Sequence, residues 1–316
     1  MSENLSLLPS YTALHRSGEL RRRAAQAAAG LRHCSLCPRH CGVNRLEGQV
    51  GFCRAGAEPV VASWNLHPWE EPPISGTRGS GTIFFSYCTA RCIFCQNYPI
   101  SQLGVGRRYT TRQLADMMLE LQERGAHNIN LVTPTHFVPQ FLEALELAAG
   151  DGLTLPIVYN TSGYETVETL RLLDGVVDIY LPDAKYADDE VARAVSSFAG
   201  YVSANRAALQ EIFRQVGDKL ILDENGLLRR GMIIRHMVLP AGLAQSAQVF
   251  RWIAEHLSPH VYVSVMNQYF PAYKALDHPL LGRKITEEEY AEAVDAFFDA
   301  GLHNGWMQEC ELDDAA

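Results

Sequence analysis

The stretch that decides the fold is Thr82-Ile83-Phe84-Phe85-Ser86-Tyr87-Cys88-Thr89-Ala90-Arg91-Cys92-Ile93-Phe94-Cys95. An apolar, β-prone run opens it, and three cysteines at C-x3-C-x2-C spacing follow: Cys88, Cys92 and Cys95. Iron–sulfur clusters are held by cysteine thiolates, and a four-iron cubane normally takes four of them. Three close thiols without a local fourth therefore predict a cluster with one open iron. The alternative is a structural zinc knuckle, but zinc usually takes two CxxC-like pairs.

Strand and helix patterns alternate from residue 81 onward. Apolar runs predict buried strands at about 82–87, 128–132, 155–159, 177–181, 231–238 and 260–266. A helical pattern follows each, at about 110–124, 138–149, 165–173, 188–216 (one helix or two), 245–257 and 286–300. Capping boxes begin at Thr110, Ser162 and Thr286. An Asn-Gly pair predicts a hairpin insertion within 219–229.

Six βα units in succession predict an α/β fold with parallel strands joined by right-handed crossovers. A closed barrel of this type uses eight units, so six predict a partial (β/α)6 TIM-like barrel, with a doubly wound sheet as the alternative. In both folds the ligand site lies at the carboxyl ends of the strands. The Cys88 loop follows the first strand and belongs to that edge.

We divide the chain into three parts. Residues 1–80 are expected to form an N-terminal helix, capped by Ser17, and an irregular Cys-rich module. Residues 81–301 are expected to form the barrel, and 302–316 an acidic tail that contains a passive thiol, Cys310. Seven of the eight cysteines fall in the range from Cys34 to Cys95. Such clustering indicates that these cysteines bind metal rather than serve as scattered thiols of the core.

The module contains a second cysteine set with the pattern C-x2-C-x3-C-x11-C, formed by Cys34, Cys37, Cys41 and Cys53. Four thiols complete a coordination shell, so this site is expected to be closed. Zinc needs only a tetrahedron of thiolates, and an auxiliary iron–sulfur cluster suits the same spacing. Both alternatives stay open here, and an unliganded or redox-active set of thiols is a third. With either metal, folding of residues 34–56 should depend on binding it.

The motif Cys88-x3-Cys92-x-Phe94-Cys95 after the first strand resembles the signature of radical S-adenosylmethionine (radical SAM) enzymes. Its flanks, 84–88 and 95–101, resemble an uncharacterised group related to pyruvate formate-lyase activating enzymes, and the likeness runs from about 34 to 300. The resemblance implies a [4Fe-4S] cluster whose open iron chelates S-adenosyl-L-methionine (SAM). One electron, from a donor such as flavodoxin or ferredoxin, then cleaves SAM to a 5′-deoxyadenosyl radical that abstracts hydrogen from a substrate.

The resemblance also implies where the rest of the SAM site lies. Phe94 would pack near the adenine, although core packing explains it equally well. Where the family commonly has Gly-Gly-Glu to bind the SAM amine, this chain has Thr133-Pro134-Thr135-His136, which lacks a carboxylate. Later strand ends resemble family segments and add further candidates for SAM or substrate binding: Thr133, Thr135, Asn160, Ser162, Asp183, Lys185 and Arg235. Arg235 is a candidate carboxylate clamp, with a structural ion pair as the alternative.

These features predict an enzyme that makes a radical from SAM, with a glycyl-radical enzyme partner as the leading substrate. The alternatives are radical modification of another peptide or small molecule and, in a different class, a non-catalytic iron- or zinc-binding scaffold. The chain carries 27 basic and 36 acidic side chains, a formal net charge of −9, which argues against nucleic-acid and anionic-membrane partners. Without a signal-like start or a long apolar run, we expect a cytoplasmic protein.

Overall fold

The computed structural model describes residues 8–308, and Cys310 with the rest of the acidic tail beyond residue 308 lies outside them. Within this range the strands form a ten-stranded sheet of order β10-β9-β8-β6-β5-β4-β2-β1-β3, with β7 paired to β8. Their bounds are β1 Val60–His67, β2 Ser80–Phe85, β3 Arg107–Arg108, β4 Ile129–Val132, β5 Ile157–Thr161, β6 Ile179–Pro182, β7 Ile221–Leu222, β8 Leu228–Met237, β9 Tyr262–Met266 and β10 Asn304–Met307.

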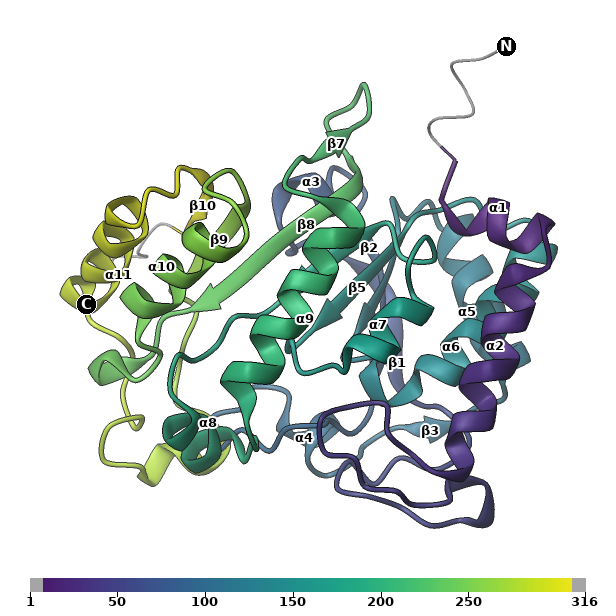
Figure 1. Ribbon diagram of the computed structural model, residues 1–316, viewed down its shortest axis with the longest axis horizontal. Helices are drawn as coiled ribbons and strands as arrows, with labels where there is room; N and C mark the ends of the chain where they lie inside the picture. Colours follow the sequence, from purple (N-terminus) through teal and green to yellow (C-terminus); the bar gives the residue numbers. More distant parts are fainter. Residues whose placement is uncertain (1–7, 309–316) are drawn as a thin grey trace.

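Neighbouring strands from β2 to β10 along this path pair in parallel, whereas β1 and β3 are antiparallel at the opposite edge. The sheet stays open because β3 and β10 form its two ends. Helices cover its outer face (Figure 1). The prediction of an α/β partial barrel is confirmed.

Along the chain, the helices either precede β1 or lie between successive strands. Their bounds are α1 Tyr11–Arg16, α2 Glu19–Ala29, α3 Pro72–Ser75, α4 Tyr98–Ser101, α5 Thr111–Glu123, α6 Val138–Gly150, α7 Val167–Leu172, α8 Asp189–Ser196, α9 Tyr201–Val216, α10 Ser246–His256 and α11 Glu287–Asp299. The capping boxes at Thr110 and Thr286 are both formed. The predicted segment 188–216 is two helices, α8 and α9, and the predicted hairpin is the β7–β8 pair.

Two predicted helix starts are wrong. The cap of α2 is Gly18 at φ +77°, whereas Ser17 ends α1 and donates its hydroxyl to Leu14 O. Glycine adopts this left-handed conformation without strain, so the tight turn between the helices needs it. Helix α7, predicted over 165–173, begins at Val167 and is capped by Thr166, not Ser162, because residues 162–166 continue as an irregular loop beyond β5.

The stretch 34–80 is less irregular than predicted, because it contains β1. This eight-residue strand pairs antiparallel with β2, and its far end, His67, lies beside Ser80 at the start of β2. Segment 68–79 therefore sits at the amino ends of the parallel strands. Ile74 of α3 packs there against residues of β5, β6 and β8, namely Val158, Ile179, Leu181, Leu228 and Ile233. The predicted tail likewise contains an additional parallel strand, β10.

Candidate functional site: two cysteine sets at the strand ends

The loop between β2 and α4 carries Cys88, Cys92 and Cys95, and each sulfur has a polar neighbour. Ala90 N–H donates to Cys88 Sγ at 3.3 Å, Ser196 Oγ to Cys92 Sγ at 3.0 Å, and Ser101 Oγ lies 3.1 Å from Cys95 Sγ. Burial raises the pKa of Cys88 to about 12 and that of Cys92 to about 11. Thiolates are the form that binds iron, so cluster binding must displace these protons.

The ends of β2 and β4 are held in a conformation that non-glycine residues rarely adopt. Tyr87, just before Cys88, has φ +69°, and Thr133 has φ +57°. The Thr133 N–H donates to Asn160 O at 2.9 Å, which ties this turn to β5. A β-branched residue at positive φ is an outlier, and such strain persists only where surrounding contacts enforce it.

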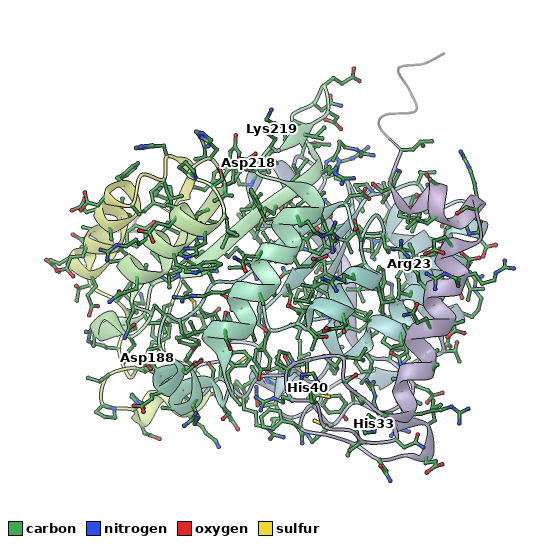
Figure 2. The ribbon with its side chains drawn as sticks, in the orientation of Figure 1. Arg23, His33, His40, Asp188, Asp218 and Lys219 are labelled. Carbon is green, nitrogen blue, oxygen red and sulfur yellow. The ribbon has the colours of Figure 1, made fainter. Side chains whose placement is uncertain are left out.

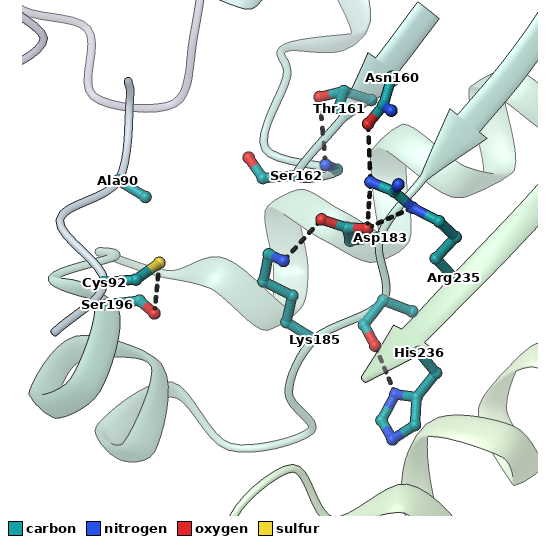
Figure 3. A network of polar contacts seen from close by, with 12 residues as sticks. Ala90, Cys92, Asn160, Thr161, Ser162, Asp183, Lys185, Ser196, Arg235 and His236 are labelled. Atoms are coloured by element: carbon teal, nitrogen blue, oxygen red, sulfur yellow. Dashed lines mark hydrogen bonds and ion pairs between the residues drawn. The ribbon is translucent and has the colours of Figure 1, made fainter. Parts of the chain in front are cut away.

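A polar network lies beside this loop, at the ends of β5, β6 and β8 (Figure 3). Lys185 Nζ is 2.6 Å from Asp183 Oδ2, and Arg235 Nε donates to Asp183 Oδ1 at 2.9 Å. Arg235 Nη2 donates to Asn160 Oδ1 at 2.7 Å. Burial acts to raise the pKa of Asp183, but Arg235 and Lys185 outweigh it and hold that pKa below the usual range. Asp183 is therefore an anion between two cations.

Two acidic residues of this network, Glu70 and Glu71, escaped the sequence analysis. Asn130 Nδ2 donates to Glu70 Oε1 at 3.0 Å, and Arg235 Nη1 lies 3.9 Å from Glu70 Oε2. Burial raises the pKa of both carboxyl groups. Glu70 and Glu71 stand in the loop before α3, and Asn130 is 60 residues away in sequence, so no local pattern could have linked them.

The turn after β4 receives a carboxylate from another loop. Thr135 Oγ1 donates to Glu165 Oε1 at 2.6 Å, and the Thr161 hydroxyl bonds to the same oxygen. Glu165 is 1% exposed, its Oε2 lacks a hydrogen-bond partner among the described residues, and burial raises its pKa to about 7. The Thr135 hydroxyl is thus already engaged. The buried Ser162 hydroxyl also lacks a hydrogen-bond partner within residues 8–308.

Phe94, in the loop that carries the three cysteines, lies in a buried apolar cluster. Its ring makes an edge contact with Tyr269, with 5.7 Å between centroids. The Ala275 N–H donates to Ile93 O at 2.9 Å and holds the loop against residues 273–277. Core packing by Phe94 is therefore present in the structure, whereas the contact with adenine stays a prediction.

The upstream cysteines, Cys34, Cys37, Cys41 and Cys53, line one small cavity together with Arg39, Arg45 and His136. Figure 2 shows His33 and His40 of this segment on the same side of the molecule as Asp188, which caps α8. Backbone bonds between Cys34 and residues 42–43 close the loop. Among residues 8–308, no three His, Cys, Asp or Glu side chains converge on one point where they could hold a single metal ion, and this applies to both cysteine sets.

Comparison with known proteins identifies a family that contains the Cys88 motif. Residues 82–220 match the model of the radical SAM superfamily. An uncharacterised protein of Methanocaldococcus jannaschii is 33% identical over 274 residues, which cover 84% of this chain and 74% of that protein. A second uncharacterised protein of the same organism is 26% identical over 157 residues, covering 44% of this chain and 46% of that protein.

Solved structures with a similar chain course include two enzymes. Methylornithine synthase has 18% identity and a TM-score of 0.41, with 68% of this chain and 60% of that chain covered. The FeFe-hydrogenase maturase HydG from Carboxydothermus hydrogenoformans has 13% identity and a TM-score of 0.47, with 93% and 66% covered. The narrower resemblance to pyruvate formate-lyase activating enzymes is not tested by these comparisons. In the described part of the chain, every helix is too short or too polar to cross a bilayer.

Proposed function

The chain belongs to the radical SAM superfamily of enzymes, and on that premise we propose that Cys88, Cys92 and Cys95 hold a [4Fe-4S] cluster at which SAM is reductively cleaved. The observation that carries this proposal is the thiol trio at the end of β2, each sulfur with one polar neighbour. The trio suits a cluster, because three thiolates leave one iron open. When bound, the cluster and SAM supply one electron and an organic radical that removes hydrogen from a substrate.

Hydrogen-bond donors and a nearby cation of the chain should influence the reduction potential of the cluster and the pKa of its cysteine ligands. The Ala90 N–H and the Ser196 hydroxyl donate to Cys88 and Cys92, and hydrogen bonds to cluster sulfurs set the reduction potential. Lys185 lowers the pKa of Cys92 against the larger effect of burial, which raises it. The partly buried ammonium group of Lys185 therefore favours the thiolate form of Cys92, which iron requires.

Asp183 and Lys185 are the proposed polar contacts for SAM or substrate. Arg235 serves as a positioning residue, because its guanidinium group is engaged by Asp183 and Asn160. Glu70 extends this network toward the amino ends of the strands. The proposed SAM-binding surface is completed by Thr133 and Ser162, at the ends of β4 and β5, and by Asn160. Thr135 supports this surface through its hydrogen bond to Glu165.

The upstream cysteines are proposed to hold a second metal, either zinc or an auxiliary iron–sulfur cluster. The support is that all four line one cavity, and holding a single zinc ion would require their sulfurs to move closer together. Radical SAM enzymes need a reductant, and we expect a flavodoxin or ferredoxin in that role. The proposed substrate is a glycyl-radical enzyme partner, with another peptide or small molecule as the rival.

The direct test is release of 5′-deoxyadenosine by the anaerobically reconstituted and reduced full chain with SAM. The wild type should release it, Cys92→Ala should not, and Cys310→Ala is the matched control because its cysteine lies outside both sets. No release from the wild type under any reductant would favour the non-catalytic scaffold. If 5′-deoxyadenosine forms, a glycyl-radical signal on an added candidate enzyme separates the activating role from the rival substrates.

A further inference from the structure

Arg45 is a buried cation beside the upstream thiols. It is 1% exposed, and within residues 8–308 no carboxylate lies within ion-pair distance of it. Its guanidinium group donates to Gly56 O at 2.6 and 3.0 Å and to His136 O at 2.7 Å, and Nη1 lies 4.0 Å from Cys34 Sγ. A buried guanidinium without an anion is costly. Thiolates in the cavity would supply the missing negative charge.

Arg39 links this cavity to the Cys88 loop. It stands between Cys37 and Cys41 in sequence and lines the cavity. Its Nε donates to Thr89 O at 2.7 Å, one residue beyond Cys88. Its Nη2 donates to Ser197 O at 2.5 Å, one residue beyond the serine that bonds to Cys92 Sγ. One guanidinium group therefore contacts both backbone segments that support the sulfurs of the trio.

A second arginine makes the reverse connection. Arg91, inside the Cys88 loop, donates from Nη2 to Phe52 O at 3.0 Å, and Phe52 precedes Cys53. Both guanidinium groups lie over the Phe52 ring, Arg39 at 3.3 Å and Arg91 at 4.6 Å from its centroid. These residues form the Arg39–Phe52–Arg91 clasp. An arginine from each cysteine segment therefore donates to a backbone carbonyl group of the other: Arg39 to Thr89 O, and Arg91 to Phe52 O.

We propose that the upstream cysteines hold a redox-active iron–sulfur cluster that passes one electron to the Cys88 cluster across the Arg39–Phe52–Arg91 clasp. The electron enters from an external one-electron reductant. In the transfer the upstream cluster is oxidised by one electron, the Cys88 cluster is reduced by one, and no atom moves. Two nearby cations, Arg39 and Arg45, offset the negative charge that four thiolates and a reducible cluster bring. Zinc has no redox chemistry and would not use this connection. The inference rests on the proposed function at Cys88.

Metal content is the first test. The full chain with Cys88→Ala, Cys92→Ala and Cys95→Ala is reconstituted anaerobically with iron, sulfide and zinc, so that the upstream set stays intact. We expect about half the wild-type iron and an electron paramagnetic resonance (EPR) signal on reduction. Zinc without an EPR signal, or no bound metal, overturns the inference. This result does not depend on SAM cleavage, so it separates failure of the inference from failure of the proposed function.

Electron transfer is the second test. Wild-type protein is fully reduced, the reductant is removed, and SAM is added. The upstream EPR signal, identified from the triple variant, should disappear, and 5′-deoxyadenosine should approach two per chain, because each cleavage consumes one electron. Persistence of the upstream signal while one equivalent of 5′-deoxyadenosine forms overturns the relay.

The clasp has its own variants. Arg39→Gln removes a positive charge next to both sets, so the midpoint potentials of both EPR signals should become more negative. Arg39→Lys keeps the charge and should restore them. Arg124→Gln is the control, since Arg124 is exposed and pairs with Glu120 on α5. Unchanged potentials in Arg39→Gln would contradict a role for the clasp.

Discussion

Arg235 Nε donates to Asp183 Oδ1 at 2.9 Å and thereby joins the end of β8 to the end of β6. The two strands share few ladder pairs, and a single bridge continues them at these same two residues. On its other side Asp183 meets Lys185. The ion pair therefore links β6 to β8 where their ladder is short and keeps a carboxylate near the Cys88 loop.

The Asp183–Arg235 pair should be important for stability. Arg235→Met leaves Asp183 buried with one cation fewer, and breaking a buried pair costs about 3–5 kcal/mol. Arg112→Met is the matched control, because Arg112 forms exposed pairs with Asp116 and Asp151 that are worth under about 1 kcal/mol. Urea unfolding of the full chain measures both. Equal losses in the two variants would contradict a special role for the buried pair.

Lys185 should affect the cluster through Cys92. Lys185→Met removes the cation that opposes burial at this thiol, so metal affinity or SAM cleavage should fall by about 10–100-fold. Lys185→Arg keeps the charge and should retain most of both. The measurements are iron retention during chelator challenge and the rate of 5′-deoxyadenosine release. Normal iron retention and normal cleavage in Lys185→Met would be incompatible with this role.

The Ser196 hydroxyl should adjust the reduction potential. Ser196→Ala removes the donor to Cys92 Sγ, so the cluster becomes harder to reduce and its midpoint potential more negative. Ser203→Ala is the control, because this exposed hydroxyl donates to Gly200 O, just before the same helix, and is remote in sequence from both cysteine sets. EPR-monitored redox titration measures the shift. If the two variants give the same potential as wild type, the hydrogen bond has no influence on the cluster.

Glu165 should make stability depend on pH. Burial raises its pKa from 4.5 to about 7, and Asp183 adds to this effect, so the folded chain keeps a proton that the unfolded chain releases. Its contribution is fully present below pH 4.5 and is lost as the pH rises to about 7, a change on the order of 3 kcal/mol. Glu165→Gln should flatten the curve between pH 5 and 8. An unchanged slope in Glu165→Gln would assign the pH dependence to other groups.

Local patterns predicted much of the fold. The capping boxes at Thr110 and Thr286 are complete within four residues, and both helices begin there. The cysteine spacings and the strand–helix alternation are also local, and they led to the partial barrel. β1 was missed because it lies in a segment rich in Gly, Pro and Cys, and its pairing with β2 is a tertiary contact.

The site was harder to predict because its contacts join distant segments. Glu70 meets Arg235 through a loop before α3, and Glu165 reaches Thr135 from the next loop. The departure at Thr133 suggested a missing carboxylate, whereas the fold brings Glu165 to the same turn. Arg39 and Arg91 carry no sequence signal beyond their places beside cysteines.

The open iron at Cys88, Cys92 and Cys95 is the central claim, and EPR of the reduced full chain with and without SAM tests it most directly. We predict that SAM changes the wild-type spectrum, because it binds the iron that no cysteine holds, and that it leaves the spectrum of the Cys88→Ala, Cys92→Ala, Cys95→Ala variant unchanged. A wild-type spectrum unaffected by SAM, in protein that retains the iron of this cluster, would contradict the account.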